Sequence, residues 1–189
     1  MIVAILALQG AFAEHAAALD RLGTDHFEIR RPQDLDRPFD ALILPGGEST
    51  VMGKLLRDLD LFEPLRVRMA EGLPVFGTCA GLILLARTVE GGTPCFAAMD
   101  IAVKRNAYGR QLGSFYTQAP VLGIGTLPMT FIRAPYIASA GPAVQVLAQV
   151  DGHIVAARQG NLLATSFHPE LSADLSVHRY FLALAGRAQ

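Results

Sequence analysis

Hydrophobic residues in the first half of the chain form short continuous runs that are separated by longer segments of mixed character. The runs predict buried strands, because a strand that is covered on both faces is apolar throughout. We expect strands at 2–8, 26–30, 41–44 and 74–77, and helices at 11–22, 50–58, 62–71 and 80–88. Strands that alternate with helices predict a mostly parallel sheet with helices on both faces, a three-layer α/β sandwich.

Beyond residue 100 the pattern changes to shorter apolar runs with turns between them. These runs occupy 101–103, 129–132, 144–147 and 154–157, ahead of a predicted helix at 174–185. They predict an antiparallel extension in the second half. The chain has 189 residues and shows neither an internal repeat nor a linker, so we expect one domain spanning 1–189.

Composition and charge narrow the class of protein. Hydrophobic residues make up 51% of the chain, yet no uninterrupted apolar run reaches membrane-spanning length. A net charge of −1 gives no reason to expect nucleic acid or an anionic membrane as a partner. Residues 1–6 lack a basic region and fit a first strand better than a signal peptide. The two cysteines form no disulfide framework, which favours the cytoplasm, and no CxxC or HExxH motif supports a metal site.

The segment 77–81 is the most informative part of the sequence. Cys79 lies between Gly77 and Gly81, after one apolar run and before another, which predicts a strand, a sharp turn and a helix. Glycines at these two positions allow backbone segments to approach closely. The turn would place the Cys79 sulfur at a helix N-terminus, where the dipole favours a thiolate and N–H groups can bind an oxyanion. Taken alone, such a cysteine also fits a small buried hydrophobic residue.

A candidate base follows the apolar stretch 162–165. His168 and Glu170 are two residues apart, so in an extended segment their side chains point the same way. Glu170 would then hold the imidazole tautomer while His168 takes the thiol proton. Pro169 between them disfavours a helix. By itself the sequence His168-Pro169-Glu170 also fits an ordinary turn. It indicates catalysis only in combination with the turn at Cys79.

A third segment, 45–50, follows the apolar run 41–44. Its paired glycines, Gly46 and Gly47, can present backbone N–H groups to an anion at the end of a strand. Ser49 or Thr50 can cap the helix that follows. The segment alone fits a tight turn with a helix cap equally well. Ligands of parallel α/β sheets bind at the carboxyl ends of the strands, where segments 45–50 and 78–80 both fall.

These segments resemble the motifs of the triad glutamine amidotransferases, as Pro-Gly-Gly-Glu-Ser, Gly-Thr-Cys-Ala-Gly-Leu and Phe-His-Pro-Glu. Within that class the chain resembles the glutaminase subunits of pyridoxal 5'-phosphate synthase, from Ile2 to about Phe181. The finer resemblance is carried by segments 8–11, 14–15, 104–111, 114–115 and 131–135. The sequence departs from the family pattern at Ala7, where glycine is frequent, and in a variable stretch within 117–129.

The resemblance implies a flavodoxin-like fold and hydrolysis of L-glutamine by Cys79, His168 and Glu170. Cys79 would attack the side-chain amide, and His168 would protonate the departing ammonia and then activate water. The implied oxyanion hole consists of the N–H groups of Gly47 and Ala80, and the implied glutamine pocket of Gly47, Glu48, Ser49, Arg105, Ile132 and Arg133. Without the resemblance, the two arginines fit surface ion pairs better. No metal or cofactor is expected, because pyridoxal 5'-phosphate would be the product of the complex.

Ammonia is useful only if it reaches an acceptor before water protonates it, and the chain offers no acceptor domain. The resemblance therefore implies docking on a separate synthase subunit, a (β/α)8 barrel, in a large hetero-oligomer. We expect Gln9, Gly10 and the first helix to lie near that contact. Docking would select the form of the 45–47 loop in which an N–H faces the oxyanion.

The remaining histidines and the second cysteine carry weaker expectations. His15, on the first helix, fits a polar face or an interface, and His26, His153 and His178 fit solvated or structural positions. Cys95 fits a loop thiol.

Three other functions remain compatible with the sequence. One is a glutaminase subunit of a different amidotransferase, although the segment 105–111 argues against it. Another is a stand-alone cysteine hydrolase of the same fold, which would act without a partner. The third is a non-catalytic regulatory subunit, although the intact Cys79, His168 and Glu170 argue against it.

Overall fold

A computed structural model describes residues 1–105 and 113–187. The strands are β1 (Ile2–Leu6), β2 (Asp25–Ile29), β3 (Ala41–Leu44), β4 (Val75–Thr78), β5 (Ala86–Val89), β6 (Met99–Lys104), β7 (Ser114–Val121), β8 (Gly125–Ile132), β9 (Tyr136–Ala140), β10 (Gln145–Val150), β11 (His153–Gln159) and β12 (Leu162–Thr165). The helices are α1 (Phe12–Arg21), α2 (Ser49–Asp58), α3 (Phe62–Ala70), α4 (Ala80–Leu85) and α5 (Ser176–Ala185), with 3-10 turns η1 (Pro32–Asp36) and η2 (Pro169–Leu171).

The described strands form one long mixed sheet and a separate hairpin. The long sheet has the order β2-β1-β3-β4-β12-β11-β9-β6-β5, with β10 paired to β11, and the hairpin joins β7 to β8. The pairs from β2 through β12 are parallel, whereas β11 pairs antiparallel with β12, β9 and β10. The predicted α/β fold, a mostly parallel sheet with an antiparallel extension, is therefore confirmed.

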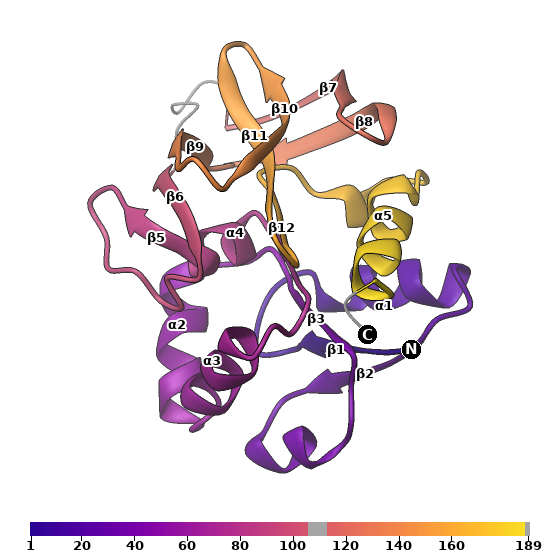
Figure 1. The fold of residues 1–189 in the computed structure, drawn as a ribbon, viewed down its shortest axis with the longest axis vertical. Helices are drawn as coiled ribbons and strands as arrows, with labels where there is room; N and C mark the ends of the chain where they lie inside the picture. Colours follow the sequence, from indigo (N-terminus) through magenta and orange to yellow (C-terminus); the bar gives the residue numbers. More distant parts are fainter. Residues whose placement is uncertain (106–112, 188–189) are drawn as a thin grey trace.

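Each face of the parallel sheet has its own hydrophobic core, and side chains of β1 alternate between the two. Leu6 belongs to the cluster that includes Met52 of α2 and Leu65 of α3. Ile5 points to the other face and shares a cluster with Phe181 of α5. Figure 1 shows α2 and α3 on one side of the parallel strands, and α1 and α5 on the other.

One predicted helix is too long. The helix expected over 80–88 ends at Leu85, and Ala86–Val89 form β5. Ala86 and Val89 are buried, while Arg87 and Thr88 between them are exposed, and β5 pairs with β6. The apolar run continues across the boundary, so hydrophobicity alone did not mark the change from helix to strand.

The sequence pattern missed three strands, namely β5, β7 and β9. The variable stretch 117–129 lies within the β7–β8 hairpin, whose two strands pair from Ser114 with Ile132 to Val121 with Gly125. The segment 106–111, which contributes to the family resemblance, lies outside the described residues.

Within the described part of the chain, no helix is long and apolar enough to cross a membrane.

The topology brings four connections to one edge of the sheet. Because β1, β3, β4 and β12 are parallel neighbours, the segments that follow them all begin at the same end. These segments are 7–11, 45–48, the turn at Cys79 and 166–170, and they carry Cys79, His168 and Glu170 of the predicted triad.

Candidate active site

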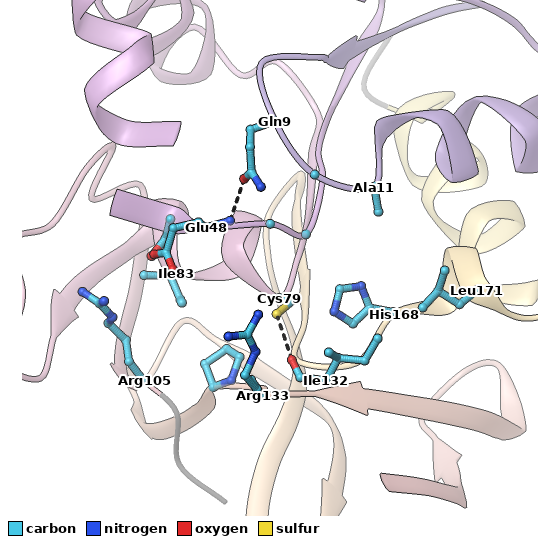
Figure 2. Close-up of a pocket in the computed structure, with 15 residues that line it drawn as sticks. Gln9, Ala11, Glu48, Cys79, Ile83, Arg105, Ile132, Arg133, His168 and Leu171 are labelled. Atoms are coloured by element: carbon cyan, nitrogen blue, oxygen red, sulfur yellow. Dashed lines mark hydrogen bonds between the residues drawn. The ribbon is translucent and has the colours of Figure 1, made fainter. Parts of the chain in front are cut away.

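A cavity of about 360 Å³ opens at this edge of the sheet. Figure 2 shows Cys79 and His168 side by side in it, below the loop that carries Glu48. All six residues predicted for the glutamine pocket line this cavity, and so do Cys79 and His168. The full lining is Gln9, Gly10, Ala11, Gly46, Gly47, Glu48, Ser49, Cys79, Ile83, Arg105, Ile132, Arg133, Pro135, His168 and Leu171.

The predicted strand–turn–helix around Cys79 is present. Cys79 connects β4 to α4 with a φ of 49° and a ψ of −97°, a conformation that is strained for a residue with a side chain. Its N–H donates to the Thr165 carbonyl at 2.8 Å, which fixes the turn to β12. A Cβ on Gly81 would overlap the Leu44 carbonyl of β3, so only glycine allows α4 to pack this closely.

His168 and Glu170 are in contact, as predicted, but not because the segment is extended. Pro169–Leu171 form the 3-10 turn η2, in which Pro169 occupies the first turn, where its missing N–H costs nothing. The turn brings His168 Nδ1 to 2.7 Å from Glu170 Oε1. Pro169 was expected to disfavour a helix here, and the helical part is limited to the three residues of this turn, with Pro169 at its start.

His168 and Glu170 are both buried, which disfavours their charged forms, but their interactions favour those forms. Burial alone would lower the pKa of His168, but hydrogen bonds with Cys79 and Glu170 and their negative charges raise the pKa to about 10. Burial alone would raise the pKa of Glu170, but the facing His15 and His168 hold it below its usual value. The geometry therefore favours an ion pair between a protonated His168 and an ionised Glu170, with the Cys79 sulfur beside it.

The loop after β3 is held in one orientation by the loop after β1. The Gly46 carbonyl accepts a hydrogen bond from the Ala11 N–H at 2.9 Å, and the Glu48 N–H donates to Gln9 Oε1 at 2.7 Å. Across a trans peptide the Gly47 N–H points opposite to the Gly46 carbonyl, and so away from Ala11. The two hydrogen bonds therefore fix the loop on either side of Gly47.

The second predicted oxyanion donor is the Ala80 N–H, at the first residue of α4. The first amides of a helix have no acceptor within it, so this N–H is available at the Cys79 turn.

The helix after the 45–48 loop is capped differently than predicted. Glu48 is the N-cap of α2, and its carboxylate accepts from the Thr50 hydroxyl at 2.9 Å.

The two predicted substrate-binding arginines enter the cavity from separate strands. Arg105 follows β6 and Arg133 follows β8, and Figure 2 shows both side chains directed toward the space below Glu48. Arg133 has a φ of 42°, and the preceding Ile132 carbonyl lies 4.0 Å from the Cys79 sulfur. The end of β8 therefore places an arginine and a backbone carbonyl close to the predicted nucleophile.

The expectation for His15 was wrong. His15 is fully buried rather than on a polar face, and its ring contacts His178 of α5 and Thr78 of β4. The buried positions of α1 are His15, Ala18 and Leu19. The spacing of three and four residues is that of one helix face and can be read from the sequence. His15 was not assigned to that buried face because its side chain is polar. His178 is also fully buried, which fits a structural position.

Within residues 1–105 and 113–187, no group of three or more His, Cys, Asp and Glu side chains is arranged to hold a metal ion. Cys79 and Cys95 are both free thiols, and Cys95 is half-buried.

Comparison with known proteins gives concordant results. A sequence model of the SNO glutamine amidotransferase family matches residues 5–185. The chain is 60% identical over 184 residues to pyridoxal 5'-phosphate synthase subunit PdxT of Methanocorpusculum labreanum, covering 97% of each chain. It is 55% identical over 188 residues to PdxT of Streptococcus pneumoniae, again covering 97% of each. A solved glutamine amidotransferase has a TM-score of 0.93 and 47% identity, covering 98% of this chain and 100% of that one.

Proposed function

Because this chain belongs to the SNO glutamine amidotransferase family, we propose that it hydrolyses L-glutamine to glutamate and ammonia and supplies the ammonia to a pyridoxal 5'-phosphate synthase. The observation that carries the proposal is the cavity at the strand ends. It combines a strained cysteine turn, a His168–Glu170 pair and all six residues predicted to hold glutamine.

The reaction begins from the state described above, in which His168 is protonated and carries the proton of the Cys79 thiol. The Cys79 thiolate then attacks the side-chain amide carbon of glutamine, and the N–H groups of Gly47 and Ala80 stabilise the oxyanion. His168 donates its proton to the departing nitrogen, and the C–N bond breaks. Ammonia departs, and the acyl group remains attached to Cys79 as a thioester. His168 next takes a proton from water, which attacks the thioester and releases glutamate. Glu170 keeps the His168 ring oriented and stabilises its charged form.

Charge around the cavity suits an amino acid substrate. An arginine guanidinium can bind the α-carboxylate in bidentate fashion, a role that Arg105 or Arg133 can fill. Glu48, on the opposite loop, suits the α-ammonium group. In this pose the side-chain amide of glutamine extends toward Cys79.

The need to deliver the ammonia to an acceptor indicates what kind of partner the chain binds. The similar proteins are named as subunits of a synthase, and family resemblance makes the acceptor a (β/α)8-barrel subunit. We place the docking surface at the loop 9–11 and α1, because that loop holds the Gly46 carbonyl and the Glu48 N–H. A partner bound there would favour the orientation that directs the Gly47 N–H to the oxyanion. The proposed assembly is a large hetero-oligomer in the cytoplasm, without a cofactor bound to this chain.

The decisive experiment compares two cysteine variants in a glutamine hydrolysis assay, with and without the synthase subunit. Cys79→Ala should abolish glutamate release, because the thioester cannot form. Cys95→Ala is the matched control and should retain activity, because Cys95 lies outside the cavity. A glutamine-like electrophile should alkylate Cys79 alone.

The same assay separates the alternatives. A stand-alone hydrolase would show full activity that the synthase subunit does not change, and a regulatory subunit would show none under any condition. Alkylation of Cys95 with retained activity in Cys79→Ala would overturn the assignment of the nucleophile.

A further inference from the structure

A chain of buried polar side chains lies directly behind the candidate triad. His15 of α1 places Nδ1 at 3.0 Å from His178 Nε2 and Nε2 at 3.1 Å from Thr78 Oγ1. The same His15 Nε2 lies 3.6 Å from Glu170 Oε2, and both side chains are completely inaccessible to solvent. The contacts thus connect two helices to the carboxylate that contacts His168 and to the residue before Cys79.

Burial disfavours the charged forms of both histidines of this chain. Burial lowers the pKa of His178 to about 3, and it also lowers the pKa of His15 although Glu170 opposes it. The charged groups around them are Glu170 and His168 of the 168–171 turn, Glu14 of α1 and Arg21 at the end of α1. A neutral imidazole has one N–H and one lone pair, so the network is defined by which nitrogen carries each hydrogen.

One arrangement of these hydrogens satisfies the geometry better than the other. If His178 Nε2–H donates to His15 Nδ1, then His15 carries its hydrogen on Nε2, directed at Thr78 Oγ1 and Glu170 Oε2. The reverse arrangement turns the His15 Nε2 lone pair toward the ionised Glu170. It also leaves a hydrogen on His178 Nδ1, an atom that has no hydrogen-bond partner within residues 1–105 and 113–187. A buried N–H without an acceptor is more costly than a lone pair without a donor.

We propose that His15, held in its Nε2–H form by His178, is a positioning residue that fixes the Glu170 carboxylate and through it the His168 imidazole. The proposal rests on the glutaminase function proposed above. At 3.6 Å the His15–Glu170 contact is longer than a normal hydrogen bond, so it acts through attraction between the N–H dipole and the carboxylate. Glu170 Oε1 is then left to accept from His168, at 2.7 Å.

The network also has a packing role that any test must separate from positioning. His15 and His178 each contact the Phe76 ring edge-on, with centroids 5.9 and 5.8 Å apart. A phenylalanine at either position retains a flat ring in this cluster but removes the nitrogen atoms. A glutamine at position 15 places an amide N–H near the site of Nε2 and restores a donor toward Glu170.

The kinetic test measures glutamine hydrolysis by the complex with the synthase subunit. His15→Phe should lower kcat roughly 10- to 100-fold with KM changed less than about threefold, the size of effect seen when a supporting contact is lost. His15→Gln should recover most of that kcat. The matched control is His26→Phe, because His26 lies on β2 and pairs with Asp20 at the surface. Its kcat should equal that of the wild type.

The second readout does not depend on activity. Nitrogen-15 NMR of the imidazole rings in the wild-type protein should show His15 protonated at Nε2 and His178 protonated at Nε2. His15→Phe should shift the His168 ring signals, whereas His26→Phe should not. An Nδ1–H form of His15, or a folded His15→Phe variant with wild-type kcat, would overturn the positioning role. Loss of hydrolysis in the wild-type complex itself would instead refute the proposed function, while the NMR result on the tautomer would stand.

Discussion

At the scale of single residues, the site depends on a histidine that stays charged in a buried position. The hydrogen bonds of His168 with Cys79 and Glu170 raise its pKa to about 10 against the effect of burial. An imidazolium beside the cysteine favours the thiolate that the reaction requires. Glu170 contributes to this charge state, but it does not exchange protons with the substrate in the mechanism proposed above.

Replacement of either member of the pair therefore has different expected effects. His168→Asn removes the only proposed base and should reduce kcat to background. Glu170→Gln keeps the size of the side chain and removes its charge, so kcat should fall by roughly 10²- to 10⁴-fold but remain measurable. Steady-state kinetics of both variants with saturating synthase subunit provide the measurement. Equal and small losses in the two variants would place the base elsewhere.

The residues of the candidate triad could be selected from the sequence because each lies in a short segment with a recognisable local pattern. Cys79 stands between two glycines of a turn, and His168 and Glu170 are neighbours in the chain. His15 and His178 could not be found this way, because their contact joins α1 to α5 across 163 residues. Only the folded chain places them behind Glu170.

At the scale of elements, the parallel half was predictable and the second half was predictable in part. The apolar runs expected beyond residue 100 lie in β6, β8, β10 and β11, and the expected last helix is α5. Strands β1, β3 and β4 are continuous apolar runs because helices cover both faces of the sheet. The strands β5, β7 and β9 have exposed faces, and β7 alternates between exposed and partly buried positions, so their apolar signal is weak. Their strand state depends on pairing partners that are distant in the chain.

The loop between β3 and α2 allows a test with paired glycine variants. A Cβ on Gly46 would overlap the His168 imidazole, so Gly46→Ala should reduce kcat by at least about 10²-fold through displacement of the base or the oxyanion donor. Gly53→Ala, in helix α2, is the control, because its Cβ would meet only ordinary contacts at 3.6 Å or more. That variant should retain activity and gain roughly 0.4–1 kcal/mol in unfolding free energy, measured in urea.

At the scale of the whole molecule, His168 in the site and His178 behind it have opposite effects on the pH dependence of stability. The folded pKa of His168, about 10, is above the usual 6.5, so its contribution is complete below pH 6.5 and is lost as pH rises toward 10. The folded pKa of His178, about 3, is below 6.5, so its contribution is complete above pH 6.5 and is lost as pH falls. Stability should therefore be greatest near pH 6.5.

The acid side of this maximum can be assigned to the buried histidines. Between pH 6.5 and 5 the unfolded chain binds a proton at His178 that the folded chain does not, because burial excludes the charged ring. That difference should lower the unfolding free energy by about 2 kcal/mol at pH 5, and His15 should add to the loss. Glu170 does not contribute in this interval, because its usual pKa of 4.5 is already below it and its folded pKa is lower still.

Urea unfolding at pH 6.5 and pH 5 checks this expectation in the wild type and in His178→Phe. The variant keeps a ring against Phe76 but has no proton to gain, so its loss of stability over the interval should be smaller by about 2 kcal/mol. If His178→Phe and the wild type lost stability equally, the folded protein would have to accommodate a charged His178. The packing of α5 against α1 would then be looser than the structure shows.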